Sequence, residues 1–138
     1  MKTYRLIGHT ADISIRVKGS NLKSLFKNAA LAVFDIMAAR RNSGALPKKK
    51  LRISQDAQTR EELLINWLNE LLFLSAAKGL IFTGFKIDNL TDYRIEAMAV
   101  AEDINNYKVN TEIKAATYHQ LQLKKSGSTW QAEIILDV

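Results

Sequence analysis

The sequence predicts a single α+β domain, residues 1–138, in which two amphipathic helices pack with a mixed, largely antiparallel set of strands. Three observations predict this class. Apolar residues recur at helical spacing in two segments, several shorter runs alternate between apolar and polar residues, and strand follows strand with only the two helices between them. A chain of 138 residues is also long enough to bury a sizeable core.

The first helix is expected to begin after Ser20 or Asn21, because either side chain is a suitable N-cap. Its apolar residues recur at steps of three and four. These residues define one face that should meet the core: Leu22, Leu25, Phe26, Ala29, Ala30, Val33, Phe34 and Met37.

The second helix is expected to begin with a capping box, in which Thr59 caps the helix and Glu62 reaches back. Gly79, directly after Lys78, is typical of a helix end. One broad face is apolar except for a serine and should be buried: Leu63, Leu64, Trp67, Leu68, Leu71, Leu72 and Ser75.

In several of the remaining segments apolar and polar residues alternate, which is typical of strands. A turn is expected at Asp88–Asp92, and a hairpin turn at Ser126–Ser128. The expected strands are residues 13–18, 51–54, 81–87, 93–100, 112–117, 119–123 and 130–136.

Composition narrows the class of protein. The chain contains no cysteine, which excludes structural disulfides, zinc ribbons and thiol catalysis and favours a cytoplasmic protein. No run approaches the roughly 18 apolar residues of a membrane span, and the first residues do not resemble a signal peptide. The net charge of +6 suits RNA or an acidic partner, but an incidental basic surface explains it equally well.

The segment Arg40–Lys50 is expected to be a mobile loop, because it contains Asn42-Ser43-Gly44 and the single proline, Pro47. Such a loop would either contact RNA phosphates or serve as a solvated linker. Its five positive charges are Arg40, Arg41, Lys48, Lys49 and Lys50.

Two aspartates stand at the ends of expected strands. Asp12 precedes the strand that starts at Ile13, and Asp137 follows the last strand and precedes Val138. If these strand ends are neighbours, the two carboxylates need a proton, a cationic side chain or a metal to coexist. Oxygen ligands suit calcium or magnesium, and the carboxylate of Val138 would add one more. Spacing alone favours the alternative that the two aspartates never meet.

Other polar residues leave several functions open. Lys114 would either face solvent or bring its ammonium to the same carboxylates or to a phosphate. His9 and His119 are weak evidence for a transition-metal site. A hydrolase with either histidine as base and Asp12 as its orienting group is conceivable, but no nucleophile motif accompanies them. A metal-dependent phosphoesterase that uses Asp12 and Asp137 is a further alternative.

Taken together, the motifs resemble the archease family over nearly the whole chain. The combination is specific, whereas His-Thr-Ala-Asp alone would be weak. The resemblance is carried, in chain order, by His9-Thr10-Ala11-Asp12-Ile13, Leu25-Phe26, Ala29-Ala30, Glu62-Leu63-Leu64, Trp67-Leu68-Asn69-Glu70-Leu71-Leu72, Lys114-Ala115-Ala116-Thr117-Tyr118-His119 and Leu136-Asp137-Val138.

The resemblance implies an accessory role. Archeases are protein cofactors of the RtcB-type RNA ligase of tRNA splicing and RNA repair; they promote its guanylylation and multiple turnover and are not thought to be enzymes themselves. It implies a metal site at Asp12, Asp137 and Val138, with calcium expected in the isolated protein and magnesium or manganese as alternatives. It also implies that Lys114 is critical for activation, and that tRNA or RNA is met through the ligase. The alternative is an RNA-binding or chaperone-like module that acts through its basic surface.

Two positions depart from the family pattern. Many archeases have Gly-Glu where this chain has Ala101-Glu102, and many have a histidine where this chain has Tyr107. The resemblance therefore assigns no role to those positions here.

Overall fold

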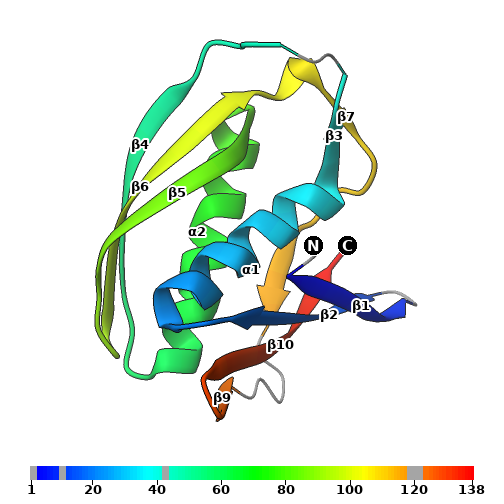
Figure 1. Ribbon diagram of the computed structural model, residues 1–138. Coiled ribbons are helices and arrows are strands. Elements are labelled where there is room, and N and C mark those ends of the chain that lie inside the picture. Colours follow the sequence, from blue (N-terminus) through cyan, green and yellow to red (C-terminus); the bar gives the residue numbers. More distant parts are fainter. Residues whose placement is uncertain (1–2, 10–11, 42–43, 118–122) are drawn as a thin grey trace.

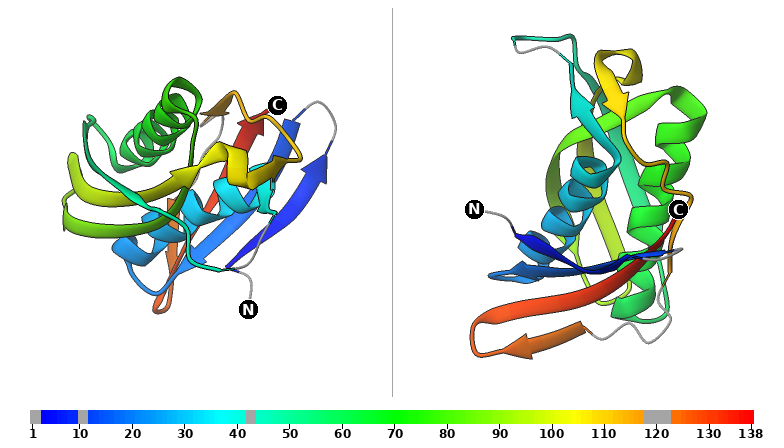
Figure 2. Two further views of the ribbon diagram at one scale, coloured as in Figure 1. Left: turned by 90° about the horizontal axis from the view of Figure 1, so that it is seen from above. Right: turned by 90° about the vertical axis from the view of Figure 1, so that its right-hand side faces the viewer.

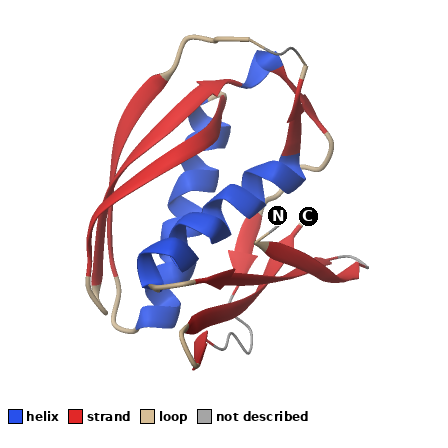
Figure 3. Cartoon of the chain, in the orientation of Figure 1, coloured by secondary structure: helices blue, strands red, loops and turns tan. Residues whose placement is uncertain are grey.

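A computed structural model describes residues 3–9, 12–41, 44–117 and 123–138 and shows the predicted α+β class. Two long helices lie between a five-stranded and a three-stranded sheet (Figure 1; Figure 3). Every strand pair within the described ranges is antiparallel. None of the helices in these ranges is long and apolar enough to cross a membrane.

The strands form three sheets. The five-stranded sheet has the order β1-β2-β10-β8, with β9 also paired to β10. A three-stranded sheet has the order β4-β6-β5, and β3 pairs with β7. The strands are β1 Tyr4–His9, β2 Asp12–Gly19, β3 Ala38–Arg40, β4 Lys49–Asp56, β5 Leu80–Leu90, β6 Arg94–Asp103, β7 Tyr107–Val109, β8 Ala115–Thr117, β9 Leu123–Ser126 and β10 Thr129–Asp137; a 3-10 turn, η1, covers Ile104–Asn106.

Both helices begin at their predicted capping residues, and α2 also ends at the predicted residue, Gly79. Helix α1 spans Leu22–Met37, and the side chain of its N-cap, Asn21, accepts a hydrogen bond from the N–H of Ser24 at 2.8 Å. Helix α2 spans Arg60–Lys78. Thr59 Oγ1 accepts from the N–H of Glu62 at 3.1 Å, and Gly79 ends the helix in the left-handed conformation at φ 65°.

The core fills the space between the helices and the two larger sheets. The predicted apolar faces of both helices are buried there, with only Leu22 partly exposed. Trp67 of α2 is fully buried, and its Nε1–H donates to the carbonyl of Phe26 in α1 at 3.0 Å. Alternate residues of β2, namely Ile13, Ile15 and Val17, complete the core on the side of the five-stranded sheet.

Several strands differ from the prediction. Within the predicted strand 112–117 only Ala115–Thr117 forms a strand; directly before this segment, the N–H groups of Asn110 and Thr111 donate to the carbonyl of Met37 at the end of α1. Strand β5 runs on to Leu90, so the turn expected at 88–92 falls later. Strands β1, β3 and β7 were not among the predicted elements. Residues 118–122, which hold most of the strand expected at 119–123, lie outside the described ranges.

Candidate functional site

The two predicted aspartates face each other across neighbouring strands. In the register of β10 and β2, Asp137 is the direct partner of Asp12, and Leu136 is the partner of Ile13. Ile13 and Leu136 are buried, and alternate residues of a strand point to opposite faces. Asp12 and Asp137 therefore share the outer face of the sheet, which is the face turned away from the helices, and both are exposed. Figure 2 shows β10 alongside β2, with the C-terminal end at the rim of this sheet.

The charges of this pair are uncompensated within the described part of the chain. None of its ion pairs involves Asp12 or Asp137. Two like charges directly opposite each other on antiparallel strands destabilise the pair of strands. Two exposed carboxylates offer up to four oxygens, so this donor set fits a hard divalent cation whose remaining positions are filled by water. No group of three histidine, cysteine, aspartate or glutamate side chains suited to a metal occurs in the described ranges.

Val138 continues directly from this pair. Its side chain is half-buried and packs against the core. This packing anchors the main chain that follows Asp137, so the residue is positioned by apolar contact.

Lys114 lies next to Asp137 through its main chain. Strand β8 pairs Ala115 with Asp137, and the N–H of Lys114 donates to the carbonyl of Asp137 at 2.8 Å. The Lys114 side chain is exposed, and among the described ion pairs none joins its ammonium to Asp12 or Asp137. It instead lines a cavity of about 770 Å³ beside α2, together with Phe73, whose side chain is 64% exposed.

A half-buried asparagine of α2, whose role was not predicted from the sequence, holds β8 in place. Asn69 Nδ2 donates to the carbonyl of Ala116 at 3.0 Å, and Asn69 Oδ1 accepts from the N–H of Ala116 at 2.7 Å. The amide thus takes the place of a neighbouring strand along the free edge of β8. A polar residue within the apolar run from Trp67 to Leu72 was the signal that could have identified it.

The predicted basic loop is only partly a loop. Arg40 belongs to β3, and Lys49 and Lys50 belong to β4, so the prediction of a loop over the whole segment was wrong. Pairing with β7 and β6, which are distant in sequence, draws these residues into strands. The two arginines also serve the fold: Arg40 donates to the carbonyl of Gly44 at 2.5 Å, and Arg41 Nε donates to the carbonyl of Tyr107 at 3.1 Å.

One position that departs from the family pattern, Tyr107, lies in a buried cluster with Glu102, the residue after the other departure, Ala101. Tyr107 donates its hydroxyl to Glu102 Oε1 at 2.5 Å, and Arg40 Nη2 lies 3.4 Å from Glu102 Oε2. Glu102 is 3% exposed. Burial, followed by the bond to Glu102, raises the pKa of Tyr107 to about 12. The cluster connects β6 with β7 and β3, so it holds the two-stranded sheet against the three-stranded sheet.

Neither histidine side chain lies within the described part of the structure. His9 ends β1 opposite Ile13, but its side chain is not described, and His119 lies outside the described ranges. The hydrolase hypothesis based on either histidine therefore stays a prediction.

Comparison with known proteins identifies the family. Residues 4–138 match the model of the "Archease protein family (MTH1598/TM1083)". A protein archease of Methanosarcina barkeri is 35% identical over 144 residues, which cover 99% of this chain and 97% of that protein. A protein archease of Sulfurisphaera tokodaii is 33% identical, with both chains covered completely.

Two solved structures have the same fold. The solution structure of protein 1598 of Methanobacterium thermoautotrophicum superposes with a TM-score of 0.73 at 28% identity and covers all of both chains. The crystal structure of an "archease, possible chaperone" from Thermotoga maritima superposes with a TM-score of 0.69 over 97% of this chain and 96% of that one, at 22% identity. On the family model and the whole-length relatives, this chain belongs to the archease family.

Proposed function

We propose that this protein activates an RtcB-type RNA ligase of tRNA splicing or RNA repair through an acidic tip, made of Asp12, Asp137 and Val138, with Lys114 beside it. Membership of the archease family supports this role. The observation that carries the proposal is the direct pairing of Asp12 with Asp137, since a fixed pair of exposed carboxylates attracts a divalent cation. We propose calcium as the ion in the isolated protein, with magnesium or manganese as alternatives, and the cytoplasm as the compartment.

In this proposal the chain acts on a partner and catalyses no reaction itself. A bound cation would supply positive charge for the phosphates of the ligase's nucleotide. Asp12 and Asp137 would hold it on a rigid sheet, and the packing of Val138 would fix the last main-chain oxygens. Lys114, a compact point charge at the edge of the tip, would meet a phosphate or an acidic group of the ligase. Guanylylation would then be promoted because the nucleotide is positioned and its charge is neutralised.

The test compares matched substitutions that remove one negative charge each. Asp12→Asn and Asp137→Asn change the tip, whereas Asp88→Asn changes an exposed aspartate of β5 whose only ion pair among the described residues is a long one, 3.9 Å from Arg52. Each variant is mixed with an RtcB-type ligase, GTP and RNA, and ligase guanylylation and turnovers are counted. We expect the tip variants to lose stimulation and calcium binding, and Asp88→Asn to behave as the wild type. Equal stimulation by the wild type and Asp12→Asn would refute the proposal that the acidic tip activates the ligase.

A phosphoesterase that uses Asp12 and Asp137 gives a different result in the same assay. Metal-dependent hydrolysis of RNA or a phosphate ester by the purified protein alone, lost in Asp137→Asn, would favour that reading. An effect that requires the ligase would favour the activator.

The second candidate function is an RNA-binding or chaperone-like module. Its support is the net charge of +6 and the description of the Thermotoga maritima relative as a possible chaperone. This function would not need the acidic tip, so Asp12→Asn would leave RNA retention and suppression of aggregation unchanged.

A further inference from the structure

We propose that the protein binds the phosphate backbone of RNA directly, through a basic patch of Arg5, Arg16 and Lys18 on the outer face of the five-stranded sheet. The patch lies on the same face as the acidic tip but at the other end of β2. It does not rest on the proposed ligase activation.

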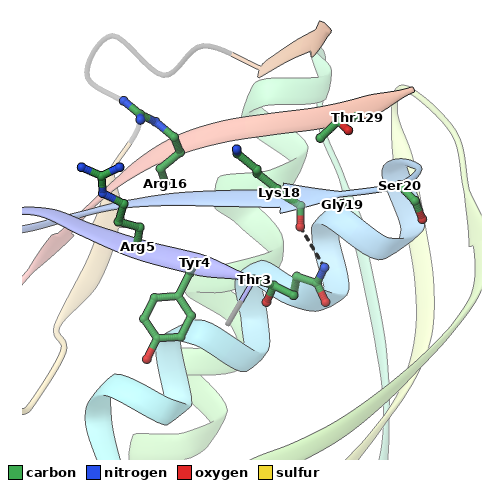
Figure 4. A pocket seen from close by; sticks show the side chains of 9 residues that line it. Thr3, Tyr4, Arg5, Arg16, Lys18, Gly19, Ser20 and Thr129 are labelled. Carbon is green, nitrogen blue, oxygen red and sulfur yellow. Dashed lines mark hydrogen bonds between the residues drawn. The ribbon is translucent and has the colours of Figure 1, made fainter. Parts of the chain in front are cut away.

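The strand register gathers the three cations. Arg5 of β1 is the direct partner of Arg16 of β2, and Lys18 follows two residues later on the same face. Successive residues of one face are about 7 Å apart along a strand. Figure 4 shows Arg5, Arg16 and Lys18 directed to one side of the sheet, with Tyr4 directed to the other.

The charges of the patch are only partly balanced. Arg16 donates to Glu133 Oε1 from Nη2 at 2.6 Å and from Nε at 3.1 Å. No hydrogen bond or ion pair in the described part of the chain uses the side chain of Arg5 or Lys18. Two arginines directly opposite each other repel, and one glutamate offsets only one of three cations. An external anion would relieve this repulsion.

A cavity beside the patch offers further hydrogen-bond donors. Its volume is about 480 Å³, and its wall includes the hydroxyls of Thr3, Ser20 and Thr129. Hydroxyls and guanidinium groups are the usual donors to phosphate and sugar oxygens. Helix α1 also begins beside this cavity and has no acidic residue in its first turn, so its positive end adds to the attraction for an anion.

These donors favour RNA over an acidic protein surface. A protein partner would need apolar or aromatic anchors at the centre of the contact. The one aromatic ring among the described wall residues is Tyr4, whose hydroxyl is bonded to Asp35 of α1 and whose ring points away from the patch. A row of cations with hydroxyls matches a repeating phosphate backbone instead.

The experiment measures binding of a fluorescently labelled short single-stranded RNA by anisotropy, in the absence of any ligase and at rising KCl. The double variant Arg5→Gln/Lys18→Gln removes two charges from the patch. Its matched control, Lys48→Gln/Lys49→Gln, removes two charges near the start of β4. We expect the patch variant to bind about tenfold more weakly and with a salt slope lower by about two, and the control to lose less than about threefold. Glu133→Gln should bind more tightly, because it removes the carboxylate that pairs with Arg16.

Each other outcome would overturn the proposal. Equal weakening by the two double variants would mean that net charge alone attracts RNA. Absence of binding at low salt would exclude the site, and competition by polyglutamate equal to that by unlabelled RNA would indicate an acidic protein partner. Displacement by millimolar inorganic phosphate or GTP would indicate a small-anion site. If both double variants melt at the same temperature as the wild type, weaker RNA binding cannot be caused by loss of the fold.

Discussion

Replacement of Asn69 by leucine should destabilise the protein far more than its partial exposure suggests. The amide of Asn69 is the hydrogen-bond partner of both main-chain polar groups of Ala116, at 3.0 and 2.7 Å, and Ala116 is 3% exposed. Leucine has a similar shape but no polar atom, so it leaves a buried donor and a buried acceptor without partners. Each such loss costs about 1–3 kcal/mol, so two of them should lower the free energy of unfolding by about 2–6 kcal/mol.

The matched control is Asn66→Leu, in the preceding turn of the same helix. Asn66 makes one hydrogen bond, to the carbonyl of Asp56 at 3.1 Å in an exposed position, so its loss should cost about 0.5–1 kcal/mol. Urea unfolding at equilibrium measures both values. Hydrogen exchange should also show faster exchange of the Ala116 amide in Asn69→Leu alone. If the two variants lose the same stability, the inference that Asn69 replaces a strand neighbour of β8 is wrong.

Two further predictions concern backbone space and pH. Gly19→Ala should lower the free energy of unfolding, measured in urea, more than Gly79→Ala does. A Cβ at Gly19 would lie 2.4 Å from the nitrogen of Leu25, whereas at Gly79 only the left-handed φ of 65° is unfavourable. Equal losses in the two variants would contradict the tight contact at Gly19. Because the pKa of Tyr107 rises from its usual value near 10 to about 12 in the folded protein, the unfolded chain loses this proton first, and stability should fall as pH rises from 10 to 12. The Tyr107→Phe variant should show a shallower fall in this range, and an unchanged slope would show that Tyr107 does not cause the fall.

The helices could be predicted from local sequence because their signals are local. Asn21 and Thr59 cap the helix starts within three residues, and Gly79 ends α2 one residue beyond it. The strand ends were harder to predict, since pairing with distant segments decides them. Arg40 illustrates this: it lies in a turn-rich segment, yet pairing with Tyr107 draws it into a strand.

The sequence could predict only part of the arrangement that places Asp12 opposite Asp137. Alternation requires Ile13 and Leu136 to point into the core, so both aspartates must point outward, and a register slip by one residue would bury one of them. Local sequence could not show that β2 and β10 are neighbours, because more than a hundred residues separate them. The role of Asn69 could not be predicted for a similar reason, since its partner Ala116 lies 47 residues away in the sequence.

The acidic tip and the basic patch lie on one sheet face yet should act independently. Along β2, Arg16 lies four positions from Asp12 and Lys18 six positions from it, which are spans of about 13 and 20 Å. The Debye length at physiological salt is about 8 Å, so the tip carboxylates repel RNA at the patch only weakly. Asp12→Asn should therefore leave RNA affinity unchanged while it abolishes calcium binding, and Arg5→Gln/Lys18→Gln should do the reverse. Loss of both properties in either variant would mean that the face works as one continuous site, in which RNA and metal bind together.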